Sequence, residues 1–134
     1  MPILRSKTIS VSINCSPEKV YAFVYGVKNF PKWANGFALS AKKVGSKWIL
    51  ETTSGNVIFA FVKRNSLGVL DHFVTVQGKV FYNPMRVVSN ETGSEVVFTL
   101  FQHDGMSSKQ FTEDAQIVQC DLNSLKKVLE RSSK

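Results

Sequence analysis

The residues best suited to chemistry lie in a hairpin near the middle of the chain. Residues 67–76 and 79–88 both have the composition of strands, and Gln77-Gly78 between them is a two-residue turn that predicts a hairpin. The register of such a hairpin puts His72 opposite Asn83. The face that carries this pair is otherwise apolar and consists of Leu70, His72, Val74, Phe81, Asn83 and Met85. An imidazole beside a carboxamide in an apolar wall predicts one side of a ligand cavity.

Three roles for His72 remain open at this stage. It is a core histidine satisfied by Asn83 or the backbone, a ligand-binding residue, or a catalytic general acid/base whose ring Asn83 orients. Asp71 is not its partner, because neighbouring side chains on a strand point to opposite faces.

The opposite face of the hairpin carries charged residues. Asp71 lies diagonally from Arg86, and we expect an ion pair between them. Pro84 lacks an N–H and could introduce a bulge, in which case the faces exchange and Arg86 lines the cavity. Glu51 lies between apolar neighbours; solvent exposure at a sheet edge is favoured, and an inward-facing acid/base with a raised pKa is the alternative.

The elements that position these residues follow from pattern. Residues 5–14 alternate as a half-buried strand, and Ser16-Pro17-Glu18 starts a short helix, with a turn and a second short helix around Pro31. Six further strands are expected at 37–44, 47–53, 56–64, 67–76, 79–90 and 94–103. Short turns join these strands, which predicts an antiparallel meander.

The last segment is predicted to be a long helix with one apolar stripe. Ser107 and Gln110 form a capping-box pair. The stripe follows at alternating four- and three-residue steps and consists of Phe111, Ala115, Val118, Leu122, Leu125 and Leu129. Only the concave side of the sheet can bury it. The sequence therefore predicts an α+β helix-grip fold: a seven-stranded curved antiparallel sheet around the C-terminal helix, with a cavity between them.

Further cavity residues follow from this arrangement. Val118 and Leu122 on the helix stripe and Phe98 on the last strand are expected to face the cavity. Trp33 and Trp48 offer flat surfaces for packing or for ligand stacking. His103, just before Asp104-Gly105, is expected to be exposed.

Length, charge and cysteine content narrow the classes of function. The chain of 134 residues is expected to form one domain over 1–134. Its net charge of +7 comes from scattered Lys and Arg without an aromatic-basic motif, so we expect no nucleic-acid partner. No apolar run is long enough for a signal peptide or a membrane helix, so we expect no membrane span and a cytoplasmic location. Cys15 and Cys120 lack metal-ligand spacing, so we expect no metal site, and we expect no cofactor.

Several strands are apolar on both faces. Residues 57–62 and 96–101 show this pattern, and one helix layer covers only one face of a sheet. We therefore expect a homodimer through the convex face.

The sequence also resembles a known superfamily. Residues 16–24 and 29–33 resemble the opening of the SRPBCC superfamily, the START-like and pollen-allergen-like fold. Residues 67–72, 83–87 and 93–101 are similar to its bacterial polyketide cyclase/dehydrase-type branch. The resemblance implies a cavity for a hydrophobic ligand and, in some relatives, cyclase or dehydratase chemistry. It supplies no catalytic set to carry over.

Three functions are consistent with these observations. The first is binding of a small hydrophobic or amphipathic molecule between the sheet and the C-terminal helix. The second is a cyclase- or dehydratase-like enzyme that uses His72 as general acid/base. The third is a non-catalytic protein-interaction module.

Overall fold

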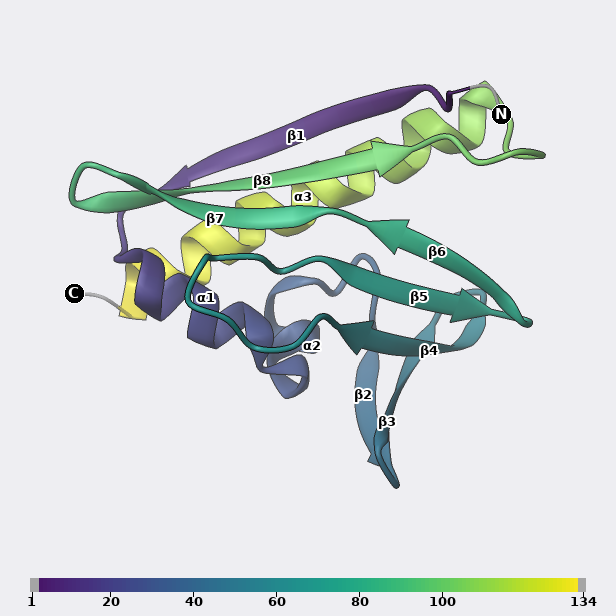
Figure 1. Cartoon of the computed structure of the whole chain (residues 1–134), viewed down its shortest axis with the longest axis horizontal. Helices are drawn as coiled ribbons and strands as arrows, with labels where there is room; N and C mark the ends of the chain where they lie inside the picture. The colour runs from purple at the N-terminus through teal and green to yellow at the C-terminus, as the bar shows by residue number, and fades with distance from the viewer. Residues whose placement is uncertain (1–2, 133–134) are drawn as a thin grey trace.

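The computed structural model describes residues 3–132 and contains eight strands and three α-helices in an α+β arrangement (Figure 1). The strands are β1 (Ser6–Ile13), β2 (Ser40–Val44), β3 (Lys47–Thr52), β4 (Gly55–Phe61), β5 (His72–Val76), β6 (Lys79–Asn83), β7 (Met85–Asn90) and β8 (Gly93–Phe101). The helices are α1 (Pro17–Tyr25), α2 (Phe30–Trp33) and α3 (Ser108–Ser132), with a 3₁₀ turn, η1 (Val27–Asn29), before α2.

The strands form two antiparallel sheets rather than one. One sheet has the order β1-β8-β7 and the other β2-β3-β4-β5-β6. The prediction of seven strands is wrong because the expected strand 79–90 is divided at Pro84 into β6 and β7. Proline cannot donate to the ladder. Its carbonyl instead accepts the N–H of Thr99 on β8 at 3.0 Å. The chain thereby leaves β5 and turns to β8.

The predicted hairpin register is confirmed. Val76 pairs with Lys79, Val74 with Phe81 and His72 with Asn83. Beyond Pro84 the same register continues, because Leu70 N–H donates to Met85 O at 2.8 Å. Pro84 therefore divides the strand without exchanging the two faces.

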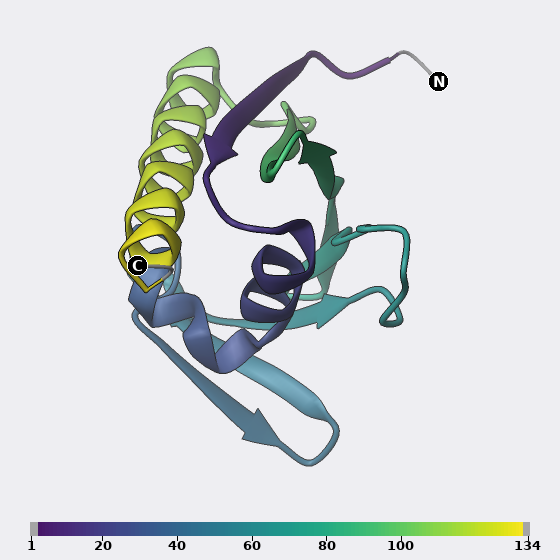
Figure 2. The same cartoon turned by 90° about the vertical axis from the view of Figure 1, so that its left-hand side faces the viewer.

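Helix α3 closes the open side of the curved sheets (Figure 2). Five members of its predicted stripe are buried and Val118 is half-buried. At its N-terminus, Ser107 Oγ accepts the N–H of Gln110 at 3.0 Å, as a cap should. None of the helices within residues 3–132 is long and apolar enough to cross a membrane.

The short helices close one end of the barrel-like interior. Ser16 takes the N-cap position of α1 and Pro17 its first turn, as predicted, although the serine hydroxyl makes no capping hydrogen bond. Phe30 is helical in spite of the following Pro31. Its ring packs edge-on against Phe59 at 4.9 Å, a contact that offsets the unfavourable backbone position.

Candidate functional site

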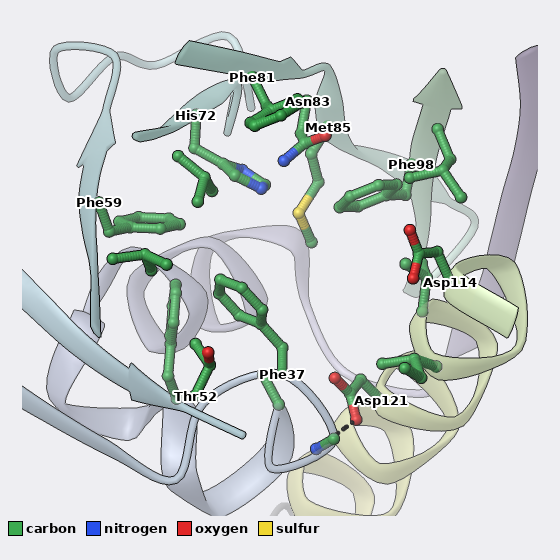
Figure 3. Close-up of a pocket in the computed structure, with 18 of the residues that line it drawn as sticks. Phe37, Thr52, Phe59, His72, Phe81, Asn83, Met85, Phe98, Asp114 and Asp121 are labelled. Atoms are coloured by element: carbon green, nitrogen blue, oxygen red, sulfur yellow. Dashed lines mark hydrogen bonds between the residues drawn. The ribbon is translucent and has the colours of Figure 1, made fainter. Parts of the chain in front are cut away.

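A cavity of about 450 Å³ lies between α3 and the concave faces of the two sheets (Figure 3). This is within the usual range for sites that bind small molecules. Its walls come from β4 to β8, from α2 and the loop after it, and from one face of α3. The exposed lining residues are Gly36, Thr53, Ser54, Gln110 and Ile117. The mouth therefore lies between the β3–β4 turn, the loop after α2 and the first half of α3.

His72 is buried in the sheet wall, with 7% of its surface exposed. Its Nδ1 lies 3.0 Å from the carbonyl oxygen of Leu70. A carbonyl only accepts hydrogen bonds, so Nδ1 carries the proton and Nε2 of the neutral ring carries the lone pair. The ring stacks on Phe59, with the centroids 5.0 Å apart. Burial lowers the pKa of His72 from 6.5 to about 4, which keeps the ring neutral near pH 7.

The Nε2 atom of His72 is a hydrogen-bond acceptor with no protein donor among the described residues. Of the two partners considered for the ring, Asn83 and the backbone, it is the backbone carbonyl of Leu70 that holds it. Asn83 points from the same wall into the cavity, and its carboxamide makes no hydrogen bond within residues 3–132. Trp33 Nε1, also in the lining, is buried without a partner. The cavity lining therefore contains three polar side chains, each with a polar group that lacks a hydrogen-bond partner among the described residues.

Asp121 is the buried polar group of the opposite wall, with 6% of its surface exposed. Its Oδ1 accepts the N–H of Gly36 at 3.1 Å, which joins α3 to the loop after α2. The missing side chain of Gly36 permits this approach, because a Cβ there would lie 2.8 Å from Oδ1. Burial raises the pKa of Asp121 to about 6, while the N–H groups of Gly36 and Phe37 lower it by stabilising the carboxylate.

Asp114 lies on the same side of the cavity, nearer the first turns of α3 (Figure 3). It is half-buried, and its Oδ1 accepts a hydrogen bond from Gln110 Nε2 at 2.7 Å. Figure 3 shows Asp114 and Asp121 on the helix side, facing His72 and Asn83 on the sheet side. The cavity thus has a neutral polar end and an acidic end, with apolar walls between them.

Eight of the predicted site residues line this cavity. They are His72, Asn83, Met85, Phe81, Trp33, Phe98, Val118 and Leu122. Leu70 is fully buried behind the wall, and Trp48 is half-buried on β3 outside the lining. Glu51 is exposed and accepts a hydrogen bond from Ser40 Oγ at 3.2 Å, as favoured from the sequence. Arg86 is exposed on the outer face.

The expected ion pair between Asp71 and Arg86 does not form. Asp71 instead accepts hydrogen bonds from Tyr82 Oη and from the N–H of Met85, both at 2.8 Å. The second bond satisfies the first amide after Pro84, at the point where the strand is divided. His103 is also placed differently from the prediction, because it is half-buried and its ring packs edge-on against Phe81 at 4.7 Å.

The acidic residues of the cavity are absent from the sequence prediction. Gln110, Asp114, Ile117 and Asp121 follow the same four- and three-residue steps as the apolar stripe, displaced by one position. This is the signal that identifies them, because a second row beside a buried stripe faces the same interior. Phe37, Phe59 and Phe61 also line the cavity and carry no such signal, since they resemble ordinary core residues.

Comparison with known proteins gives relatives in structure only. No family model and no curated protein sequence matches the chain. Among solved structures, XoxI from Bacillus cereus is 17% identical with a TM-score of 0.77, over 98% of this chain and 99% of that one. The dimeric Aha1 from Colwellia psychrerythraea is 18% identical with a TM-score of 0.75, over 95% and 97% of the two chains. DynU16, from the dynemicin biosynthetic locus, is 11% identical with a TM-score of 0.71, over 93% of this chain and 47% of DynU16.

The chain has the fold of these proteins. The curved antiparallel sheets and the long C-terminal helix confirm the predicted helix-grip architecture. At such identities the likeness concerns the fold, and function has to be argued from the site.

Proposed function

We propose that the protein binds a small, largely apolar molecule in the cavity between the sheets and α3. The observation that carries the proposal is the apolar cavity with a buried imidazole whose Nε2 lone pair has no protein donor among the described residues. Nε2 faces a largely apolar cavity, where a ligand hydroxyl or N–H would supply the hydrogen bond that no described residue makes. The guest is therefore expected to place a hydrogen-bond donor against His72 and apolar surface against the surrounding rings.

Binding of an uncharged fluorescent probe tests this proposal. N-phenyl-1-naphthylamine, whose fluorescence rises in apolar surroundings, should bind to the wild-type protein. Val118→Trp fills the cavity from α3 and should abolish this binding. Gln116→Trp adds the same side chain at an exposed position of the same helix and serves as the matched control. Equal binding by the wild type and by Val118→Trp would place the probe outside the cavity and refute the proposal.

A cyclase- or dehydratase-like reaction is the second candidate function. Two titratable groups support it: His72 is a neutral base with an available lone pair, and Asp121 on the other wall has a raised pKa suited to an acid. DynU16, a protein of similar fold, comes from a biosynthetic locus. Native mass spectrometry of protein purified from cells distinguishes the two candidates. A dehydratase predicts that His72→Ala retains a molecule heavier by one water than the wild type retains, whereas a binding protein retains the same mass or none.

We further propose that the protein is a homodimer through the outer face of β5 and β6. Phe73 and Tyr82 are 38% and 40% exposed there, with their rings stacked at 5.3 Å, and Val80 beside them is 57% exposed. Aha1, which has a similar fold, was solved as a dimer. Light scattering at tens of micromolar should give the dimer mass, and Phe73→Lys should give the monomer. A monomeric wild type would contradict this proposal. A cytoplasmic location stays a prediction from the sequence, and cell fractionation tests it.

A further inference from the structure

The charge of the cavity is opposite to the charge of the chain. The sequence has 17 Lys and Arg against 10 Asp and Glu, yet no Lys or Arg occurs among the described residues that line the cavity. Its two charged residues are both acidic, Asp114 and Asp121. Charges inside a partly dry cavity act on a guest more strongly than charges on the wet surface. The net charge of the chain suggests an anionic guest, whereas the acidic interior favours a cationic one.

Asp121 lacks a cation. Its hydrogen-bond donors are backbone amides, and no Lys or Arg within residues 3–132 forms an ion pair with it. Aspartate is rarely buried to this extent without a positive partner. Joining α3 to the loop after α2 does not require the charge, because asparagine would accept the same N–H of Gly36. The backbone amides thus explain why a hydrogen-bond acceptor lies at position 121. They do not explain why it carries a negative charge, which has no counter-ion among the described residues.

The remaining walls suit an organic cation. Eight aromatic side chains line the cavity: Phe30, Trp33, Phe37, Phe59, Phe61, Phe81, Phe98 and Phe101. A cation is attracted to the face of an aromatic ring, and the effect increases when water is excluded. A metal ion is a poorer fit, since no group of three His, Cys, Asp or Glu within residues 3–132 is arranged to hold one.

We propose, on the basis of the ligand-binding function above, that the cavity takes an amphiphilic amine. Its protonated nitrogen lies against Asp121 and Asp114 on α3, and its apolar body lies among the aromatic rings towards His72. An anionic guest of the same shape meets two carboxylates and is repelled. A neutral guest binds through the apolar contacts alone and leaves the charge of Asp121 without a counter-ion.

Displacement of N-phenyl-1-naphthylamine by three naphthalene compounds of similar size tests this assignment. The compounds are 2-(2-naphthyl)ethylamine, 2-(2-naphthyl)ethanol and 2-naphthylacetate, which are cationic, neutral and anionic at about pH 7.5. The amine should displace the probe at a concentration about tenfold lower than the alcohol needs, and the carboxylate should need the highest concentration. Asp121→Asn preserves the acceptor for Gly36 and should reduce the preference for the amine to within about twofold.

One control variant and one further test variant make the outcome decisive. Glu113→Gln removes an acidic charge from the exposed side of the same helix and should leave the amine preference intact. Asp114→Asn should reduce the preference in part, which provides a second variant if Asp121→Asn does not fold. Equal displacement by amine and alcohol, or an amine preference that survives both aspartate substitutions, overturns the assignment while ligand binding stands. Failure of the probe and all three compounds to bind refutes the ligand-binding function, and the amine assignment with it.

Discussion

At the scale of residues, the cavity holds two ionisable groups, and folding shifts their pKa values in opposite directions. The pKa of His72 is lowered from 6.5 to about 4, so the unfolded chain binds more protons at this residue between these two pH values. Stability contributed by neutral His72 is therefore lost as pH falls through that window. The pKa of Asp121 is raised from 3.8 to about 6, so protonation favours the folded state and stability is lost as pH rises. The two contributions oppose each other between about pH 4 and 6.

Substitution of His72 by phenylalanine should reveal the contribution of Asp121. The new phenyl ring would keep the stacking on Phe59 but would lose the hydrogen bond to Leu70, at a cost that does not depend on pH. We therefore compare the free energy of unfolding of His72→Phe minus that of wild type at two pH values. This difference should be about 2 kcal/mol more favourable to the variant at pH 4.5 than at pH 7. Urea unfolding at both pH values measures this difference. The same difference between variant and wild type at both pH values would show that folding does not lower the pKa of His72.

Asparagine at position 121 should have the opposite signature. Asp121→Asn removes the cost of a buried carboxylate at pH 7 and changes little once the carboxyl is protonated. The variant should gain about 2 kcal/mol over wild type at pH 7 relative to pH 4.5. The same urea titrations measure it. Loss of stability at pH 7 would show that the charge is stabilised by partners, and would also weaken the case for a cationic guest.

At the scale of elements, the approach to β5 depends on a glycine. Gly68 has a φ of +75°, and a Cβ there would clash with the carbonyl oxygen of Val87, whose N–H donates to Gly68 O at 2.9 Å. Gly68→Ala should lower the free energy of unfolding by more than about 2 kcal/mol, because the left-handed backbone and the clash act together. Gly78→Ala is the matched control: its φ is +81° but nothing lies within 4 Å. It should cost only about 1 kcal/mol in denaturant unfolding, and equal losses at both sites would exclude the clash.

The elements also show which features of the fold can be predicted from the sequence pattern. The turn at Gln77-Gly78 determines the faces of the hairpin, and α3 follows from its spacing, because both depend on neighbours along the chain. Division of the strand at Pro84 also depends on β8, because the carbonyl of Pro84 accepts the N–H of Thr99, which is a long-range contact. The ion pair of Asp71 failed for a related reason, since the freed N–H of Met85 attracts its carboxylate. Asp121 was missed because its role depends on the loop at Gly36, distant in sequence.

At the scale of the whole molecule, the fold keeps an unfilled interior beside a well-packed core. Leu125 and Leu129 on α3 are buried in the core and lie outside the cavity lining, so the helix is held whether or not the cavity contains a guest. Empty space lowers stability because the atoms around it lack contacts. The proposed binding site would thus be maintained at the expense of stability, a compromise usual for functional sites.

Filling the cavity should therefore separate stability from binding. Val118→Trp places a large apolar side chain into the space and should raise the free energy of unfolding by about 1 kcal/mol while it abolishes probe binding. Gln116→Trp, on the exposed side of α3, should change the free energy of unfolding by less than about 0.5 kcal/mol. Thermal and urea unfolding measure both variants. A destabilised Val118→Trp beside an unaffected Gln116→Trp would mean that the indole is overpacked, and that the interior is too rigid or too full to admit a guest.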